Sequence, residues 1–213
     1  MQLYHFFNSS TSYRVRIALA LKGVDYQHHG VNIRIDEQAS EEHIKLNPAK
    51  GVPVLVTDDG QTLTQSMAIL DYLECSYPET PLLPDNTLAK ARILEVAHII
   101  ASDMHPVNNL RILSYLKNEL GISEEQKVTW YQHWINEGFT SVEALLTRHG
   151  HGSYCFGDKA TLADCCLIPQ VANALRFGCN LSAFPKVLAV YDHCQLQPAF
   201  QRAAPNQQPD FIA

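Results

Sequence analysis

Hydroxyl-bearing side chains crowd one short stretch of this 213-residue chain: Ser9, Ser10, Thr11 and Ser12. The stretch falls between a predicted N-terminal strand and an amphipathic helix. A helix start leaves backbone N–H groups without partners, and the helix dipole places partial positive charge there. A cluster of hydroxyls at such a start favours an anion. The alternative is a redundant N-cap, in which one serine caps the helix and water solvates the others.

Two other places in the first eighty residues could hold polar parts of a ligand. Pro53 stands at the entrance of a predicted strand and has no N–H to give to a sheet. A cis Val52–Pro53 bond would turn the N–H and C=O of Val52 outward to pair with an extended peptide, whereas a trans bond would make an ordinary loop. Gln65 and Ser66 stand at another helix start, which suits either a carboxylate or a plain serine N-cap.

Polar residues also gather in the second half of the chain. His105, Asn108 and Asn109 are spaced three and four apart, which predicts one shared helix face. Pro106 lies within this helical pattern and predicts a kink near residues 102–106. The asparagines would then either line a ligand groove or satisfy the carbonyls that the kink frees.

Arg111 and Arg176 are each flanked by apolar residues. We expect their guanidinium groups to be partly buried, and a buried guanidinium needs a carboxylate. The carboxylate could come from an acidic ligand or from a protein Asp or Glu.

Composition limits the partners of the chain. With 46% hydrophobic and 18% charged residues, it fits one or two compact domains. Its net charge of −6 argues against a nucleic-acid or anionic-membrane surface. Because the chain has neither a secretory signal pattern nor an apolar run of about 20 residues, we expect a cytoplasmic protein.

The cysteines and histidines do not predict a metal or disulfide site. The six cysteines show no C-x-x-C spacing, so we expect reduced and mostly buried thiols. The closest histidine pairs, His28 with His29 and His149 with His151, lack further ligands at zinc-site spacing.

Hydrophobic patterning predicts two domains. The first, residues 1–80, reads βαβαββα, with strands at 2–7, 26–33, 52–56 and 62–64 and helices at 12–22, 40–46 and from 66 onward. Strands separated by helices should be parallel, whereas the last two, joined by a tight turn, should be antiparallel. This order describes an α/β domain of the thioredoxin kind, a mixed sheet with helices on both faces.

A proline-rich segment, residues 78–85, marks the predicted domain boundary. Beyond it, strand patterns largely vanish. Residues 88–213 form a predicted all-helical domain, with helices near 88–118, 124–148, 161–177 and in pieces over 185–203. Thr161 and Asp164 have capping-box spacing, with a structural role.

Several motifs together resemble the zeta class of the glutathione S-transferase family. In the first domain they are S-S-T-S-Y-R-V-R-I-A-L, N-P-x-x-G-V-P and T-Q-S-M-A-I. In the second domain they are residues 103–111, 160–164, 169–177 and 208–210. The resemblance runs from end to end, and zeta-class members include maleylacetoacetate and maleylpyruvate isomerases.

The resemblance implies glutathione as the cofactor and a residue-by-residue assignment of its site. Ser9, Ser10 and Thr11 would surround the sulfur, with Ser10 the first choice of hydrogen-bond donor and Ser9 the second. The other glutathione-binding residues would be Val52, Pro53, Gln65, Ser66, His105, Asn108 and Asn109, and the substrate-binding residues Asn8, Arg111 and Arg176. Many members carry Cys at position 11, Arg at position 8 and Gln at position 51, so contacts there would differ.

The implied reaction is the cis–trans isomerisation of maleylacetoacetate to fumarylacetoacetate in tyrosine and phenylalanine catabolism. Glutathione thiolate would add to the cis alkene, allow rotation about the resulting single bond, and leave again. The alternatives are isomerisation of maleylpyruvate, conjugation or dehalogenation of haloacids, and a noncatalytic interaction module. The family also implies a homodimer and a small dicarboxylate substrate.

Overall fold

The computed structural model describes residues 1–212, which divide into two compact units. The first unit contains Met1–Leu82 together with the C-terminal residues from Gln195 onward, and the second contains Leu83–Cys194. The sequence predicts a single helical domain over residues 88–213. The structure instead places the C-terminal residues with the first unit, because helix α10 (Pro198–Ala203) packs against helix α1 (Ser10–Lys22) there.

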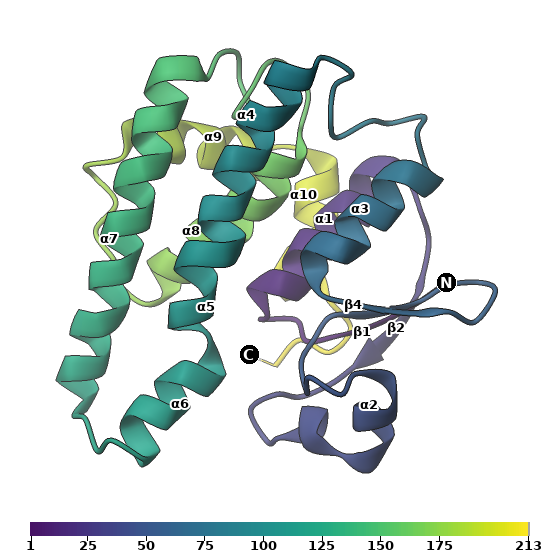
Figure 1. The fold of residues 1–213 in the computed structure, drawn as a ribbon, viewed down its shortest axis with the longest axis vertical. Coiled ribbons are helices and arrows are strands. Elements are labelled where there is room, and N and C mark those ends of the chain that lie inside the picture. Colours follow the sequence, from purple (N-terminus) through teal and green to yellow (C-terminus); the bar gives the residue numbers. More distant parts are fainter. Residues whose placement is uncertain (213) are drawn as a thin grey trace. The chain divides into compact units, whose positions relative to one another are not determined.

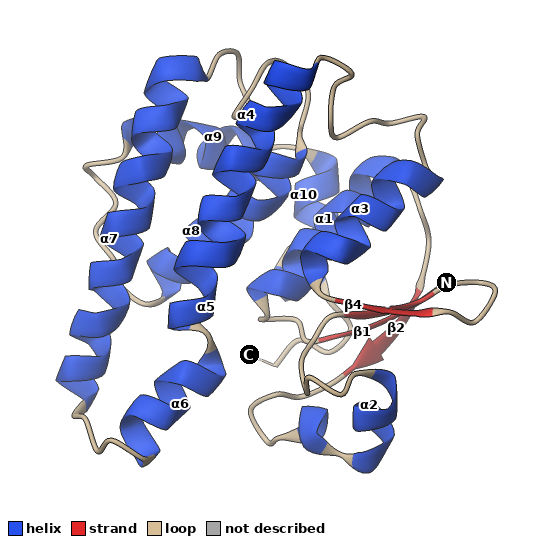
Figure 2. Ribbon diagram, viewed as in Figure 1, coloured by secondary structure: helices blue, strands red, loops and turns tan. Residues whose placement is uncertain are grey.

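The first unit is built on a four-stranded mixed sheet with the strand order β2-β1-β3-β4. The strands are β1 (Gln2–His5), β2 (Gln27–Gly30), β3 (Val54–Val56) and β4 (Thr62–Thr64). Helices α1 and α3 (Ser66–Ser76) lie on one side of the sheet and α2 (Glu41–Leu46) on the other, as Figure 2 shows. The predicted thioredoxin-like βαβαββα domain is therefore confirmed.

One strand direction differs from the prediction. Strand β1 is parallel to β2, but β3 runs antiparallel to β1 although a helix precedes it. Helix α2 has only six residues and is about 9 Å long. The connection over residues 31–53 starts and finishes at the same end of the sheet, and β3 enters in the reverse direction. The predicted antiparallel pairing of β3 with β4 is confirmed.

Helix α1 is buried almost all round, because α3 and α10 both pack against it (Figure 1). Its apolar residues Val15, Ile17 and Leu19 have no exposed surface. Two arginines on the same helix, Arg14 and Arg16, are each only 1% exposed. A buried guanidinium is costly unless its N–H groups find acceptors, so both arginines need polar partners inside this unit.

The second unit is helical, as predicted, but its first helix is not continuous. Residues 88–118, predicted as one kinked helix, form α4 (Thr87–His98), a π-helical segment (Ile99–Met104), α5 (His105–Asn108) and α6 (Leu110–Asn118). Pro106 lacks an N–H for the helical ladder, and Asn109 leaves the helical conformation with φ −74° and ψ 160°. The side chain of Asn109 then caps α6 by accepting the N–H of Ile112 at 3.1 Å.

The remaining helices of this unit are α7 (Glu124–His149), α8 (Leu162–Arg176) and α9 (Pro185–Gln195). At the start of α8, the fully buried Asp164 accepts hydrogen bonds from the N–H of Thr161 at 2.7 Å and of Cys155 at 2.9 Å. Burial raises the pKa of the Asp164 carboxyl, and these hydrogen bonds oppose the rise. Asp164 thus has the structural capping role that the sequence predicts.

All six cysteines are free, and only Cys75 is exposed. Within residues 1–212 the structure has no group of three or more side chains that could hold a metal ion. None of the described helices combines the length and the apolar character needed to cross a bilayer.

A buried histidine makes the stability of the first unit depend on pH. The side chain of His5 is fully buried, with Nε2 3.1 Å from Nδ1 of His28 and Nδ1 3.3 Å from Nη1 of Arg16. Burial, and then the positive charge of Arg16 and the neighbouring His28 and His29, lower the pKa of His5 from 6.5 to about 3. Asp210 Oδ1, 4.0 Å from Nδ1, is the acidic group that faces it.

We predict that the free energy of unfolding falls as the pH falls from about 6.5 toward 3. In this range the unfolded chain binds a proton at residue 5 and the folded chain does not, which contributes at most about 1.4 kcal/mol per pH unit. Urea unfolding of His5→Gln at several pH values should show a shallower slope than the wild type. His98→Gln, at an exposed position, is the control. An unchanged slope in His5→Gln would contradict the prediction.

Candidate functional site

The hydroxyl cluster at the start of α1 forms a directed hydrogen-bond chain. Ser9 is the N-cap, and its Oγ accepts the N–H of Ser12 at 3.2 Å. Thr11 Oγ1 donates to the carbonyl oxygen of Val52 at 2.9 Å and lies 2.9 Å from Ser9 Oγ. Because a hydroxyl has one proton, Thr11 must accept from Ser9. The chain therefore runs from Ser9 through Thr11 to Val52, and Ser10, beside it, is buried.

The Val52–Pro53 bond is cis, the first of the two alternatives for this loop. The carbonyl of Gly51 accepts hydrogen bonds from Nε2 of His43 and Nδ2 of Asn47, both at 2.8 Å. Since the C=O and N–H of a trans peptide point in opposite directions, the N–H of Val52 points away from these two side chains.

One expectation for Val52 needs correction. The sequence analysis had both its N–H and its C=O available to an extended peptide, but Thr11 already donates to the C=O. The sequence contained a signal for this hydrogen bond, because Thr11 belongs to the hydroxyl cluster of residues 9–12. The carbonyl oxygen retains a second lone pair for a ligand N–H.

The start of α3 forms a second polar site. Gln65 has φ 68° and ψ 117°, in the left-handed half of φ space that favours glycine, and its side chain is exposed. Such strained residues cluster at ligand sites, because the conformation is kept for the position of the side chain. Next to it, the buried Ser66 accepts a hydrogen bond through Oγ from Nη1 of Arg14 at 3.3 Å.

Arg14 is the site residue that the sequence analysis did not single out. It belongs to the Y-R-V-R-I-A-L stretch, where a charged residue stands between apolar ones on the first helix. Its guanidinium is buried directly behind Ser66, in surroundings where water screens its charge little. A carboxylate bound at the start of α3 would thus meet a serine hydroxyl, the positive end of the helix dipole and a fixed positive charge.

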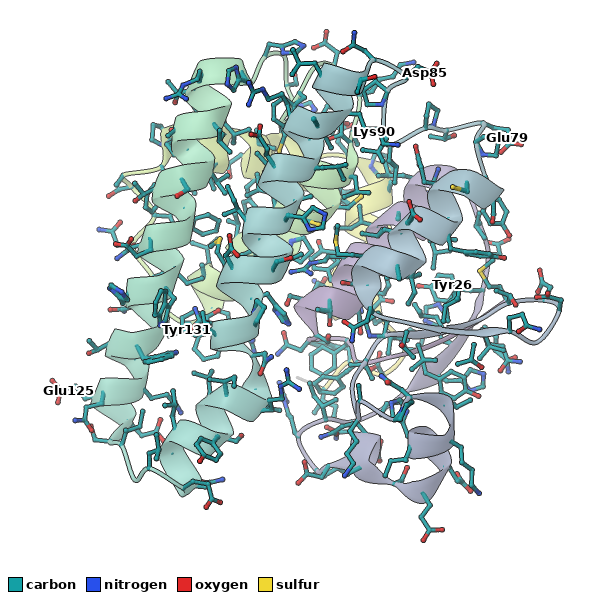
Figure 3. All side chains as sticks on the ribbon, in the orientation of Figure 1. Tyr26, Glu79, Asp85, Lys90, Glu125 and Tyr131 are labelled. Carbon is teal, nitrogen blue, oxygen red and sulfur yellow. The ribbon has the colours of Figure 1, made fainter. Side chains whose placement is uncertain are left out.

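In the second unit, Asn108 has a structural task. It is buried, and its Nδ2 donates to the carbonyl oxygen of Tyr131 at 3.1 Å. Tyr131 lies on α7 (Figure 3). Trp130 Nε1 adds a parallel link by donating to the carbonyl of Val107 at 2.9 Å. Because α5 ends at Asn108 and Asn109 is the N-cap of α6, the side chains of His105, Asn108 and Asn109 do not share one helix face, contrary to the prediction. His105 is half-buried on α5.

The two candidate substrate arginines are exposed, not partly buried as predicted. Arg176 is at the end of α8, where the chain turns at the surface. Its Nη2 donates to Oδ1 of Asn173 at 3.0 Å, and its guanidinium carbon lies 4.8 Å from the ring centre of Phe177. Arg111 is in the first turn of α6. Asn8, the third candidate, is half-buried and immediately precedes the N-cap Ser9.

The fold and the two helix-start sites define a protein of the glutathione transferase type, and comparisons with known proteins agree. The model of the glutathione S-transferase N-terminal domain matches residues 1–75. A maleylacetoacetate isomerase of Pseudomonas aeruginosa is 44% identical over 212 residues, which is 99% of this chain and 98% of the relative. A maleylpyruvate isomerase of a Ralstonia species is 44% identical over 211 residues, 99% of each chain.

Two solved structures agree with these relatives. One is the holo structure of a maleylpyruvate isomerase, a bacterial zeta-class glutathione S-transferase, with a TM-score of 0.97, 44% identity and full coverage of both chains. The other, a maleylacetoacetate isomerase of Anaeromyxobacter dehalogenans with bound dicarboxyethyl glutathione and citrate, has a TM-score of 0.88 and 35% identity over 100% of this chain and 97% of that one. The chain belongs to the zeta class of the glutathione S-transferase family.

We predict that Thr11→Val lowers the free energy of unfolding by about 1–2 kcal/mol. The variant keeps the branched shape but removes the proton donated to Val52 and the oxygen that accepts from Ser9. Thr11→Ser, which keeps the hydroxyl, is the matched control and should lose less. Urea denaturation followed by circular dichroism measures both, and a Val variant as stable as the wild type would rule out the hydroxyl chain.

Proposed function

We propose that this protein is a glutathione-dependent isomerase that converts maleylacetoacetate to fumarylacetoacetate in tyrosine and phenylalanine catabolism. The observation that carries the proposal is the pair of polar helix starts in the first unit, at α1 and at α3, each suited to an anion. Glutathione has a thiol and a γ-glutamyl carboxylate to fill them. The named activities of the relatives at 44% identity support the same assignment.

The residues of the first unit fit the tripeptide. Gln65 and Ser66, with Arg14 behind them, bind the γ-glutamyl carboxylate. Val52, held in place by its cis bond to Pro53, pairs with the backbone of the cysteinyl residue. The sulfur lies at the hydroxyl cluster, where hydrogen bonds and the helix N-terminus favour the thiolate over the thiol, whose free pKa is about 8.5.

Ser9 is the donor to sulfur that the hydrogen-bond chain favours. If Thr11 turned its proton toward the sulfur, it would give up its bond to Val52. Ser9 gives up only its bond to Thr11, and Thr11 stays attached to Val52. We therefore place Ser9 ahead of Thr11. Ser9 is also the N-cap of α1, and on that ground we propose it in place of Ser10, the first choice from the sequence. Ser10 and Thr11 have supporting roles around the sulfur.

Bound glutathione supplies a thiolate that adds to the cis double bond of the diacid and leaves after rotation, so that the trans isomer is released and the cofactor is unchanged. The hydroxyls hold the sulfur as an anion until the substrate arrives. Arg111 and Arg176 bind the carboxylates of the diacid, and positive charge also stabilises negative charge that develops on its carbonyl oxygen. Asn8 contacts the diacid.

We assign the second-unit residues His105 and Asn109 to contacts with glutathione. Asn108 acts through its bond to α7, which fixes the chain that carries His105. We also propose that the protein is a cytoplasmic homodimer, on the strength of its family. Size-exclusion chromatography with light scattering tests the assembly.

Maleylpyruvate is the alternative substrate, because a relative that matches this chain equally well carries that name. It shares the reacting cis double bond and differs in the tail beyond it. Glutathione conjugation or dehalogenation of haloacids is the second alternative, since it needs only the thiolate and a leaving group. The noncatalytic module makes no use of the hydroxyl cluster.

A single assay separates these functions. The purified protein is incubated with glutathione and either diacid, and the cis and trans isomers and the free thiol are measured together. Isomerisation leaves the thiol concentration unchanged, whereas conjugation depletes it. We expect turnover of maleylacetoacetate at constant thiol. Faster turnover of maleylpyruvate would reassign the substrate, and no turnover of either diacid would refute the isomerase.

We predict that Ser9→Ala lowers turnover about 100-fold, as expected for losing a positioned donor to a developing charge. The pKa of bound glutathione, measured by the ultraviolet absorbance of the thiolate, should rise toward its free value. Ser9→Thr keeps both the hydroxyl and the N-cap and should restore most of the activity. A larger loss in Ser10→Ala than in Ser9→Ala would return the role to Ser10.

We predict that Arg176→Ala raises the KM for the diacid about tenfold or more, since a charge-assisted contact to one carboxylate is lost. The Kd of glutathione should stay unchanged. Arg148→Ala, at an exposed arginine on α7, is the control. A KM equal to that of the wild type would remove Arg176 from the substrate site.

A further inference from the structure

The peptide that joins Phe6 to Phe7 is held from both sides by charged groups. Its N–H, on Phe7, donates to Oδ2 of Asp210 at 2.8 Å. Its C=O, on Phe6, accepts from Nη1 of Arg16 at 3.3 Å, and the next carbonyl, on Phe7, accepts from Nη2 of Arg16 at 2.8 Å. This peptide lies only two residues before the N-cap Ser9, at the point where β1 has ended and no strand can satisfy its polar groups.

Arg16 is a fixed part of the interior of the first unit. It is 1% exposed, and its Nε donates to the carbonyl of Ala203 at 3.0 Å, at the C-terminal end of α10. Burial lowers the pKa of Arg16 to about 10, so the guanidinium stays charged at neutral pH. The negative end of the α10 dipole faces this charge and stabilises it.

The segment that carries Asp210 is packed onto the first unit. Gln208 Nε2 donates to the carbonyls of Arg202 and Ala204, both at 2.9 Å, which closes the end of α10. The ring of Phe211 meets the ring of Phe7 edge to face, with 5.3 Å between centres. Asp210 itself approaches β2 so closely that a Cβ added at Gly30 would lie 3.0 Å from its Cβ.

The clamp formed by Arg16 and Asp210 is connected directly to the N-cap of α1. The carbonyl of Phe6 accepts not only from Arg16 but also from the N–H of Ser9, at 3.0 Å. A rotation of the Phe6–Phe7 peptide would therefore move Ser9. A displacement of about 1 Å at a catalytic group is enough to cost about 100-fold in rate.

From this geometry we propose that Asp210 is a positioning residue for the thiol site, acting with Arg16 through the Phe6–Phe7 peptide to aim Ser9. The proposal rests on the function proposed above, in which Ser9 holds the sulfur of glutathione. It assigns a role in the reaction to a side chain 201 residues away from Ser9 in the sequence. Asp210 acts only through the backbone and contacts neither the sulfur nor the substrate.

The test compares Asp210→Ala and Asp210→Asn with the wild type. The alanine variant removes the acceptor of the Phe7 N–H, while the asparagine variant keeps an amide oxygen in its place. Asp25→Ala, at an exposed carboxylate of the same unit, is the matched control. Arg16 is left unchanged, because removing a buried guanidinium with four acceptors endangers folding.

For Asp210→Ala we expect faster amide hydrogen exchange at Phe7, Ser9 and Ser12, and about tenfold weaker glutathione binding by calorimetry. We also expect a raised pKa of the bound thiol and a kcat about tenfold lower at saturating glutathione, with the KM for the diacid unchanged. Asp210→Asn should recover most of each effect. Wild-type exchange at Ser9 and Ser12 together with a wild-type thiol pKa and kcat would overturn the proposal, even if the variant melted at a lower temperature.

The exchange measurement needs no ligand, which separates this proposal from the proposed function. If the wild type does not bind glutathione, the proposed function fails, and exchange still reports whether Asp210 orders the N-cap. If the wild type binds glutathione and Asp210→Ala binds and reacts like it, only the positioning role fails. If Asp210→Ala does not fold, Asp210→Glu takes its place, because the extra methylene moves the carboxylate away from the N–H of Phe7. The same exchange rates, thiol pKa and kcat, set against those of Asp25→Ala, then decide between the two outcomes.

Discussion

Where β1 passes into α1, charged side chains hold the backbone: Arg16 donates to the carbonyls of Phe6 and Phe7, and Asp210 accepts the N–H of Phe7. In the proposed function the start of α1 faces a ligand, yet the helix itself is buried between α3 and α10. Side chains from distant parts of the chain hydrogen-bond to the backbone just before this helix. Arg16 and Asp210 satisfy the carbonyl and the N–H of Phe7, while Ser9 and Thr11 form the hydroxyl chain at the start of the helix.

The fold of the first unit could be predicted from the sequence because its signals are local. Alternating apolar residues, the D-D-G turn before β4 and the serine caps of α1 and α2 each act within a few residues. The direction of β3 was predicted incorrectly, since it depends on the path of the whole connection over residues 31–53, which the strand and helix patterns do not show. The cis bond at Pro53 was one of two readings, because an X-Pro pair permits both isomers until the surrounding loop selects one.

The candidate site was predictable only in part, because the sequence shows local signals but not contacts between distant residues. The hydroxyls of residues 9–11 and the Gln65–Ser66 pair stand at helix starts, and the structure places them there. The contact of Arg14 with Ser66 joins α1 to α3, so spacing along the chain does not reveal it. In the second unit, the helical spacing of His105 and Asn109 was misleading, because Asn109 begins a new helix as its N-cap.

The left-handed backbone of Gln65 has an evolutionary consequence. A residue other than glycine in that conformation costs about 1–3 kcal/mol, and selection for thermostability alone would replace it with glycine. Under the proposed function, the γ-glutamyl carboxylate that Gln65 binds offsets this cost. In a relative that no longer binds glutathione nothing would offset it, so we expect glycine to be tolerated at position 65 without loss of stability.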